Sequence, residues 1–238
     1  MARGYGQYCP LAMAAEIVAE RWTPLVLREL LFGGHTFNEI LRGVPLMSRS
    51  LLAKRLRELE KAGLVERRRA GPRGTPEYQL TEAGEALGPV MISLAEWGLR
   101  WVRRELRAEH LDPRPLMWDM RRNLNEQCLP SRRVVVNFAF TDAPRAGLRR
   151  TWLIIDGREA DVCYKDPGFP VDLIVTGKIR ALVAVWLGDI SWEQALRTED
   201  LRIEGPRELR RSFPQWLALS PVAGAQFREP SEVGLSTA

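Results

Sequence analysis

The sequence predicts a two-domain α+β protein, and three observations lead to this fold class. Helical patterns with one hairpin dominate residues 9–107, whereas short alternating segments dominate residues 132–204. Between them, Asp112-Pro113-Arg114-Pro115 places two prolines in four residues, a composition that ends a helix and stiffens a linker. A chain of 238 residues with 45% hydrophobic residues can build two packed cores. We therefore expect domains over residues 1–110 and 111–228, and a flexible tail over 229–238.

Composition narrows the class of protein. No apolar run approaches the roughly 18 residues that a membrane helix needs, so we expect a soluble, cytoplasmic protein that binds no membrane. The three cysteines, Cys9, Cys128 and Cys163, are too scattered for a disulfide framework. Because His35 and His110 are the only histidines, a zinc site or a Ser-His-Asp triad has few residues to draw on. We expect no metal and no cofactor.

The first predicted elements are short helices. Cys9-Pro10 precedes an alanine-rich helix that reaches about Ala19. Thr23-Pro24 opens a second helix, with the threonine as N-cap and the proline in the first turn. Gly33-Gly34 ends this helix, and the segment from Thr36 to Glu39 has the spacing of a capping box, which predicts the start of a third helix.

A longer helix follows the turn predicted at Gly43-Val44-Pro45. It begins after Ser48, a good N-cap residue, and Gly63 ends it. Its leucines recur at the spacing of one apolar stripe, at Leu52, Leu56 and Leu59. Its opposite face is polar and mostly basic, with Arg49, Ser50, Lys54, Arg57 and Lys61.

A basic hairpin comes next. Arg67 to Arg69 lead into the breaker cluster Gly71-Pro72-Arg73-Gly74, and Tyr78-Gln79-Leu80 forms the returning strand. Residues 49–73 hold nine Lys or Arg against three Glu, a net charge of +6, while the whole chain carries +5. Two helices, a turn and an arginine-rich hairpin in this order predict a winged helix-turn-helix. A merely solvated face would mix its signs, so this charge favours double-stranded DNA as the partner.

The position of each residue in the motif divides the expected DNA contacts. The start of a recognition helix reaches base edges, whereas wing arginines reach phosphate or the minor groove. The residues expected in the major groove are Ser48, Arg49, Ser50 and Lys54. Those expected in the wing are Arg67, Arg68, Arg69 and Arg73. Arg55 and Arg57 complete the set, unless they pair instead with Glu58 or Glu60.

A long helix is predicted after the hairpin. Thr81 is its N-cap, and the helix continues across Gly98 to about Arg107. Its apolar stripe consists of Leu87, Met91, Leu94, Trp101 and Val102. Because one small domain cannot cover so much apolar surface, we expect the 81–107 helix to join two copies of the chain in a homodimer.

Several short motifs now point to one family. They are Cys9-Pro10, Arg21-Trp22-Thr23-Pro24, Leu56-x-x-Leu59-x-x-x-Gly63-Leu64-Val65 and Tyr78-x-Leu80-Thr81-x-x-Gly84. In this order and spacing, residues 5 to 107 resemble the HxlR family of bacterial transcription regulators. The resemblance implies a homodimer that places two recognition helices in successive major grooves. It departs from the family in size, because members usually end soon after the long helix.

Cys9 has two interpretations. The resemblance implies that it could be a redox sensor, since some family members sense oxidants or electrophiles through a cysteine at this place. Its position before a helix N-terminus also favours the thiolate. Against this, a small, inert, buried cysteine is the commoner use of a lone thiol.

The second domain alternates strands and helices. Strand patterns cover Arg132 to Phe140, Thr151 to Ile155, Ala160 to Tyr164, Val171 to Val175 and Leu201 to Glu204. The turn signal Asp156-Gly157 joins the second and third of these as a hairpin. Helical patterns cover Trp118 to Gln127, Lys178 to Leu187, Trp192 to Leu196 and Pro206 to Leu217.

This order of elements resembles the sterol-carrier-protein type 2 fold, a five-stranded sheet with helices on one face. The resemblance implies an apolar cavity between sheet and helices, suited to a lipid-like or aromatic molecule. The candidate ligand-binding residues are Trp118, Phe138, Phe140, Trp152, Trp186 and Trp216. Large aromatics also serve, more commonly, as core or interface residues. Both interpretations stay open.

Three functions remain to be compared. The main hypothesis is a homodimeric DNA-binding regulator that responds to an apolar or aromatic effector in the second domain. In the alternative, that domain serves only dimerisation or partner recruitment. An enzyme acting on acyl or aromatic substrates is not expected, because the sequence has no Gly-x-Ser-x-Gly elbow and no glycine-rich phosphate loop. Beyond His110 the chain has eighteen Lys or Arg against seventeen Asp or Glu, which favours sensing or assembly over further DNA contact.

Overall fold

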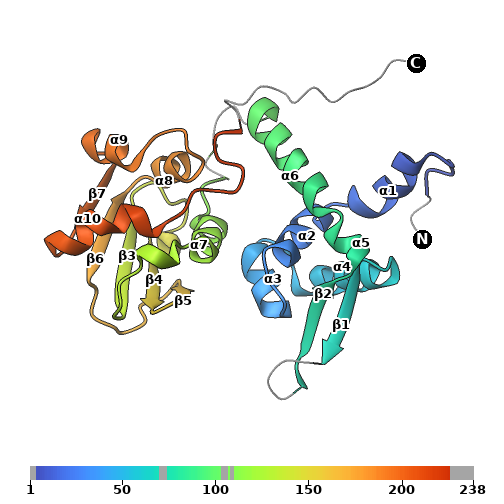
Figure 1. Cartoon of the computed structure of the whole chain (residues 1–238), viewed down its shortest axis with the longest axis horizontal. Coiled ribbons are helices and arrows are strands. Elements are labelled where there is room, and N and C mark those ends of the chain that lie inside the picture. The colour runs from blue at the N-terminus through green and yellow to red at the C-terminus, as the bar shows by residue number, and fades with distance from the viewer. Residues whose placement is uncertain (1–3, 70–73, 103–106, 108–109, 226–238) are drawn as a thin grey trace. The chain divides into compact units, whose positions relative to one another are not determined.

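The computed structural model describes residues 4–69, 74–102, 107 and 110–225 (Figure 1). They divide into two compact units between Ser93 and Leu94, inside a helix, whereas the sequence suggested a boundary at residue 110. The expected linker at residues 112–115 is wrong. Asp112 is the N-cap of α7 (Pro113–Arg122), and its carboxylate accepts a hydrogen bond from the Arg114 N–H. Prolines suit a first helical turn, where the backbone N–H has no helical partner.

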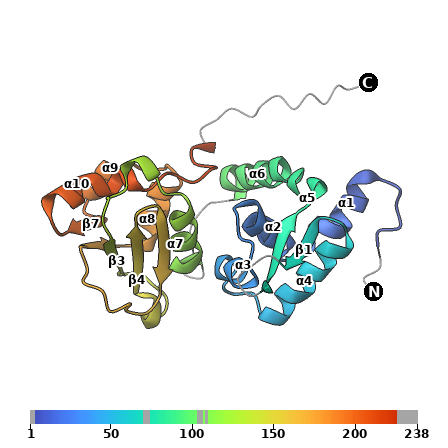
Figure 2. The same ribbon diagram turned by 60° about the horizontal axis from the view of Figure 1, so that its bottom comes forward.

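The first unit is a winged helix-turn-helix. Its described elements are α1 (Pro10–Val18), α2 (Thr23–Leu31), α3 (Phe37–Gly43), α4 (Arg49–Lys61), β1 (Val65–Arg69), β2 (Pro76–Leu80), α5 (Glu82–Glu85) and the start of α6 (Gly88–Trp97). The helices α2, α3 and α4 bury a shared core that includes Leu27, Ile40 and Leu56. The strands β1 and β2 pair antiparallel, from Val65 opposite Leu80 outward, and form the wing (Figure 2).

The predicted helix ends of this unit are mostly confirmed. Thr36 and Glu39 form the capping box, and the Ser48 hydroxyl accepts a hydrogen bond from the Leu51 N–H at 3.3 Å. Gly63 follows α4 with a φ of 72°, which only glycine adopts without strain. The start of α2 differs by one residue, because Trp22 occupies the N-cap position with a φ of 77°.

The predicted 81–107 helix is not continuous. Thr81 caps α5 as expected, but that helix ends at Glu85, and α6 begins at Gly88. Pro89 explains the break, since it has no N–H and its ring collides with the carbonyl four residues earlier in a helix. A π-helical turn over Gly98–Val102 follows α6, and residues 103–106 lie outside the described part of the chain.

The second unit is built on a five-stranded sheet of order β5-β4-β3-β6-β7. Its strands are β3 (Val134–Phe140), β4 (Arg150–Asp156), β5 (Glu159–Cys163), β6 (Leu173–Gly177) and β7 (Leu201–Glu204). Its α-helices, besides α7, are α8 (Ile179–Trp186), α9 (Trp192–Arg197) and α10 (Arg207–Trp216), with 3-10 turns at Glu126–Cys128 and Ala146–Leu148. The central strand β3 pairs antiparallel with β4 and parallel with β6. The five predicted strands are thus confirmed, whereas the helix predicted from Trp118 begins at Pro113.

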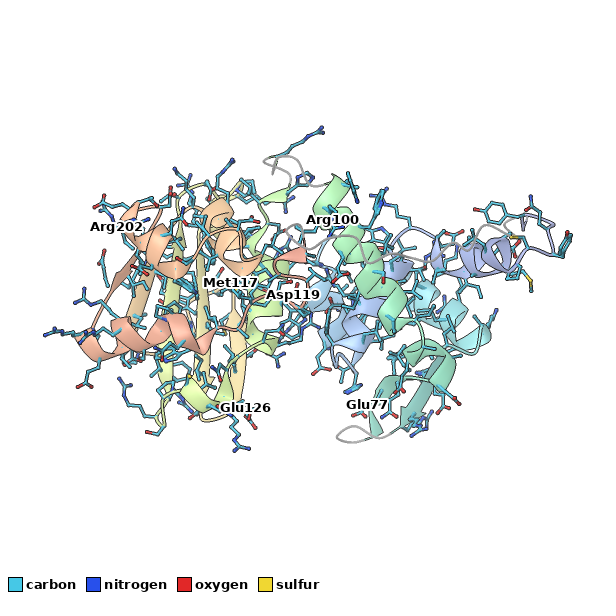
Figure 3. The ribbon with its side chains drawn as sticks, turned by 45° about the horizontal axis from the view of Figure 1, so that its top comes forward. Glu77, Arg100, Met117, Asp119, Glu126 and Arg202 are labelled. Atoms are coloured by element: carbon cyan, nitrogen blue, oxygen red, sulfur yellow. The ribbon has the colours of Figure 1, made fainter. Side chains whose placement is uncertain are left out.

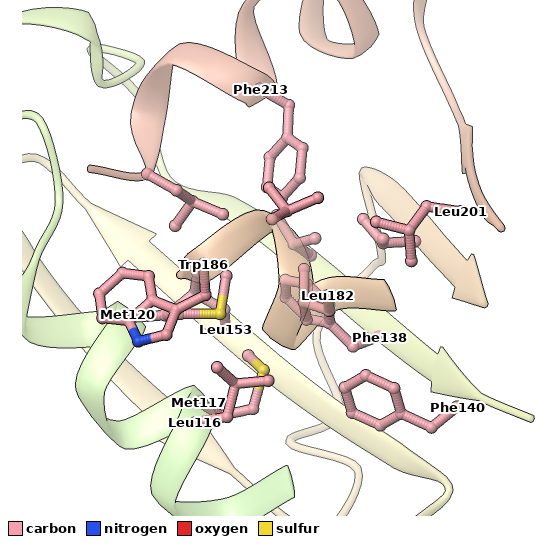
Figure 4. Close-up of a cluster of buried hydrophobic side chains, with 14 of the residues drawn as sticks. Leu116, Met117, Met120, Phe138, Phe140, Leu153, Leu182, Trp186, Leu201 and Phe213 are labelled. Atoms are coloured by element: carbon pink, nitrogen blue, oxygen red, sulfur yellow. The ribbon is translucent and has the colours of Figure 1, made fainter. Parts of the chain in front are cut away.

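Helices cover one face of this sheet and bury its apolar side chains. Figure 3 shows Met117 beside the sheet and Arg202 at the outer strand β7. In Figure 4, side chains from α7, α8 and α10, including Met117, Leu182 and Phe213, converge on Phe138 of the central strand. All four are fully buried. Within the described ranges, none of the helices combines the length and apolarity that crossing a bilayer would require.

Candidate nucleic-acid interface

The outward face of α4 carries polar and cationic side chains. Its N-terminal residues Ser48, Arg49 and Ser50 are exposed, and so are Lys54 and Arg57. The apolar stripe on the other face is buried, with Leu52 and Leu56 at no more than 1% exposure. The core therefore fixes the rotation of α4 about its axis, and that rotation directs the sequence-predicted contact residues at solvent.

Arg49 is held in place by the preceding helix. Its Nη2 donates a hydrogen bond to Oδ1 of Asn38 at 3.1 Å, and its guanidinium carbon lies 5.0 Å from the centre of the Phe37 ring. Both partners belong to α3. Sequence reasoning missed Asn38, because the spacing of α3 and α4 shows that the helices are neighbours but not which side chains meet.

Arg55 points the other way. Its side chain is only 11% exposed and forms ion pairs with Glu20 at 2.6 Å and Glu58 at 2.5 Å. Its Nε also donates to the Arg21 carbonyl at 3.3 Å. The pairing of Arg55 with Glu58 that the sequence left open is therefore present, and the same guanidinium joins α4 to the segment between α1 and α2.

The wing adds three exposed arginines on β1. Arg67 and Arg69 lie on one side of the strand and Arg68 on the other, because neighbouring strand residues alternate. Arg68 pairs with Glu66 at 2.7 Å, although both side chains remain about half exposed. Arg73, which the sequence also assigned to the wing, lies outside the described residues.

The buried carboxylate of Glu29 connects α2 to the end of α3, behind the exposed face of α4. Glu29 of α2 is fully buried and pairs with Arg28 at 2.6 Å, while Arg28 also donates to the Gly43 carbonyl at 3.0 Å. A Cβ at Gly43 would lie 1.8 Å from the Glu29 carboxylate, so a larger residue at the end of α3 would have to displace that buried side chain. The sequence placed Gly43 in the turn, whereas it is the last residue of α3.

The aromatic residues proposed as a ligand site do not form one wall. Phe138, Phe140, Trp186 and Trp216 share the core between sheet and helices. Trp152 pairs opposite Asn137, so it lies on the other face of the sheet from Phe138. Trp118 is buried beneath the guanidinium of Arg121, whose central carbon is 4.4 Å from the ring centre.

Two further features concern single polar groups. The indole N–H of Trp216 is buried and has no hydrogen-bond partner among the described residues. Buried polar groups are nearly always paired, so this donor is unusual. Cys9 is a free, half-buried thiol immediately before α1, and its side chain does not cap that helix.

Comparisons with known proteins find matches to the first part of the chain. Residues 17–106 match the model of the HxlR-like helix-turn-helix family. YvaP, an uncharacterized HTH-type transcriptional regulator of Bacillus subtilis, is 37% identical over 100 residues, which cover 40% of this chain and 91% of YvaP. An uncharacterized HTH-type transcriptional regulator of Mycobacterium tuberculosis is 40% identical over 114 residues, covering 42% of this chain and 70% of the relative. The reduced form of YodB, a transcriptional regulator from B. subtilis, is 33% identical, with 40% of this chain and 95% of YodB covered and a TM-score of 0.35.

Proposed function

This chain belongs to the HxlR-like helix-turn-helix family, and we propose that it regulates transcription by binding double-stranded DNA as a homodimer, under the control of an apolar or aromatic effector. The observation that carries the DNA-binding part is the exposed cationic face of α4 with the arginines of the wing. Family membership identifies the motif, and the core of the first unit aims these residues outward. No enzymatic role is proposed.

The contact set follows the exposure of each side chain. Ser48, Arg49, Ser50 and Lys54 reach the major groove, because they occupy the outward face at the start of α4. The exposed Arg57, Arg67, Arg68 and Arg69 meet phosphate or the minor groove, and Arg73 is assigned to the same role from its place in the sequence alone. Arg55 has a structural role, since its guanidinium already binds two carboxylates.

The test is the salt dependence of binding to duplex DNA. If a dimer makes about eight phosphate contacts, its affinity falls by around four decades between 50 and 200 mM salt, from a slope of about 0.9 per phosphate. Arg67→Ala reduces the slope, because it removes a cation from the wing. Arg202→Ala is the matched control, since it removes an exposed arginine from β7 of the second unit and leaves the slope unchanged. A shallow slope in the unaltered protein would refute the proposal.

Exposed apolar side chains along α6 and the following turn support the homodimer. Val90, Leu94, Trp97 and Trp101 are each more than half exposed. Neighbouring apolar groups of this size on a helix are normally covered by a partner. A second copy of the chain is the occupant that the family resemblance implies. We therefore propose that the seam of the dimer includes α6 and the residues up to Val102.

The second unit is proposed as the sensor. Its five-stranded sheet with helices on one face has the layers that the sterol-carrier-protein resemblance implies. The indole N–H of Trp216, which has no partner among the residues that the structure describes, supports a ligand with a hydrogen-bond acceptor on an otherwise apolar body. The alternative function, assembly alone, is favoured by the tight core, in which Phe138 and Phe213 are fully buried.

A ligand screen separates the two roles. The full-length protein is screened with a library of fatty acids and aromatic acids by tryptophan fluorescence and melting shift, and each hit is tested for its effect on DNA affinity. A regulator requires that the ligand favour one arrangement of the DNA-binding units, since equal affinity for both changes nothing. A coupling of about 1 to 3 kcal/mol, or roughly five- to 150-fold in DNA affinity, is expected. Hits that leave DNA affinity unchanged, or no hits at all, would favour assembly.

A further inference from the structure

We propose that Asn38 of α3 is a positioning residue for base recognition, which holds Arg49 so that its guanidinium reads one base pair in the major groove. This inference rests on the proposed DNA-binding function and concerns how sequence is selected. Its basis is the hydrogen bond between Arg49 Nη2 and Asn38 Oδ1, together with the packing of the same guanidinium over Phe37.

The position of Arg49 at the start of α4 fixes its backbone but not its side chain, so contacts that restrain the side chain matter. It is the first residue of α4, directly after the N-cap Ser48, so its backbone is fixed by the capped helix end. The side chain itself is exposed, and a free arginine samples many rotamers in water. The amide oxygen and the aromatic face therefore select a small part of this range before DNA arrives, which is the general benefit of preorganisation.

The contact leaves Arg49 able to read a base. A guanidinium carries five N–H donors in a planar fork, and a guanine presents two acceptors, O6 and N7, on its major-groove edge. The hydrogen bond to Asn38 uses a single donor. Enough N–H groups remain for a two-point contact with guanine, which is the base that we infer for this position.

Asn38 is suited to this role because α3 is held at both ends. The capping box of Thr36 and Glu39 fixes its first turn. The buried Glu29 packs against Gly43 at its last residue, where Arg28 also donates to the backbone. Asn38 therefore offers its amide oxygen from a rigid element, as a supporting residue must.

The role has a signature that a phosphate contact lacks. Because Asn38 is uncharged, the Asn38→Ala variant displaces as many counterions on binding DNA as the unaltered protein does. The salt slope of binding therefore stays unchanged. The loss appears instead as weaker discrimination at the base pair that Arg49 reads. A good two-point contact between arginine and guanine gives about five- to 150-fold discrimination against other bases. Asn38→Ala should remove up to about tenfold of it.

The experiment starts with the full-length protein and a randomised pool of duplex DNA. Selection with the unaltered protein defines its preferred sequence. The affinities of the unaltered protein, Asn38→Ala, Arg49→Ala and the double variant are then measured for that sequence and for each single-base change, across a salt series. We expect both single variants to lose preference at the same base pair. The double variant should discriminate no worse than Arg49→Ala alone, because the two residues act as one unit.

Two further variants separate positioning from other roles. Asn38→Asp keeps the acceptor, so it should retain the base preference while its added negative charge lowers affinity for all sequences. Arg57→Ala, the matched control on the outward face of α4, should reduce the salt slope and leave base preference intact. Thermal melting of each variant checks that the first unit is folded.

Three results would overturn the inference. Asn38→Ala could leave base preference unchanged, or its effect could add to that of Arg49→Ala at a different base pair. Loss of preference in Asn38→Asp would mean that the amide nitrogen itself reads DNA. Failure of the proposed DNA-binding function looks different, because the unaltered protein would then enrich no sequence and show no steep salt dependence, and the role of Asn38 would fall with it.

Discussion

Most described DNA-binding candidates of the first unit are polar or charged and exposed, whereas the ligand-binding candidates of the second unit are aromatic and buried. On α4, Arg57 is exposed and Arg55 is buried among carboxylates, so exposure divides one residue type into two roles. In the second unit, Phe138 and Trp216 are buried together, and the same side chains that would bind a ligand also hold the sheet to its helices. Function can therefore be altered without unfolding in the first unit, and scarcely so in the second.

The largest effect is expected in the core of the second unit. Phe213 packs against Phe138, Trp192 and Trp216, with ring centres 5.3 to 6.1 Å apart. Phe213→Ala should lower the free energy of unfolding of this unit by about 3 to 5 kcal/mol. The measurement is denaturant unfolding followed by tryptophan fluorescence, with the half-exposed Leu219→Ala as control. A loss under about 1 kcal/mol would mean that the site collapses easily or already holds space for a ligand.

The next largest effect is expected on dimer formation, from a substitution of the exposed Trp97 on α6. Trp97 is 56% exposed on α6, so Trp97→Glu should leave the fold of a single chain intact. In the proposed dimer, each copy would place an unpaired charge in the seam, at a cost of several kcal/mol. Light scattering should then report a monomer. An unchanged dimer mass would locate the interface elsewhere in the chain.

The two arginines of α4 provide the sharpest comparison. Arg55→Ala should destabilise the first unit by about 1 to 2 kcal/mol, a value reduced by solvent because its partners Glu20 and Glu58 are 44% and 43% exposed. Arg57→Ala should change stability by less than about 0.5 kcal/mol and weaken DNA binding instead. Chemical denaturation and DNA titration of both variants test this. Equal stabilities would contradict the structural role of Arg55.

The smallest expected effect depends on pH. Burial raises the pKa of Asp112, but the hydrogen bonds and charge of Arg114 outweigh it and lower that pKa below its ordinary value. A lowered folded-state pKa stabilises the fold above the unfolded-state pKa of about 3.9, and this contribution disappears as pH falls through the folded-state value. Asp112→Asn keeps a good N-cap and removes the charge. It should cost less than about 1 kcal/mol at pH 7 and progressively less below about pH 4.

Measured unfolding curves between pH 3 and pH 7 test this prediction. Arg114→Gln is the companion variant, because it removes the partner that lowers the pKa of Asp112 and should weaken the same pH dependence. A stability difference between the unaltered protein and Asp112→Asn that stays constant down to the lowest pH would contradict the assignment.

The sequence predicted features that depend on neighbouring residues. The capping box at Thr36, the glycine stop at Gly63 and the five alternating strands each have a local cause, and the structure confirms them. The family motifs likewise lie in contiguous segments. These signals sufficed for the motif of the first unit and for the strands of the second.

Features that depend on distant partners were not predictable in this way. Arg55 follows the basic pattern of α4, yet Glu20, far earlier in the chain, draws it inward. Asn38 gains its role only through Arg49. The aromatic residues of the second domain looked alike in sequence, but strand register puts Trp152 and Phe138 on opposite faces. The charge and hydrophobicity of the sequence therefore indicate where a binding surface lies, whereas tertiary contacts determine which residues belong to that surface.

The strand order of the second unit also governs when it can fold during synthesis. A ribosome delivers the chain from its N-terminus, so the first unit is complete before β3 emerges. β3 can pair with β4 as soon as both strands have been synthesised, whereas its other edge stays unpaired until β6, which begins at Leu173, has been synthesised. The apolar face of the sheet is fully covered only after α10 contributes Phe213 and Trp216. A nascent chain that stops before residue 207 therefore carries a complete helix-turn-helix unit joined to a sheet whose apolar face is still partly exposed to solvent. The apolar side chains and the unpaired strand edge of such a chain favour aggregation, and both belong to the second unit.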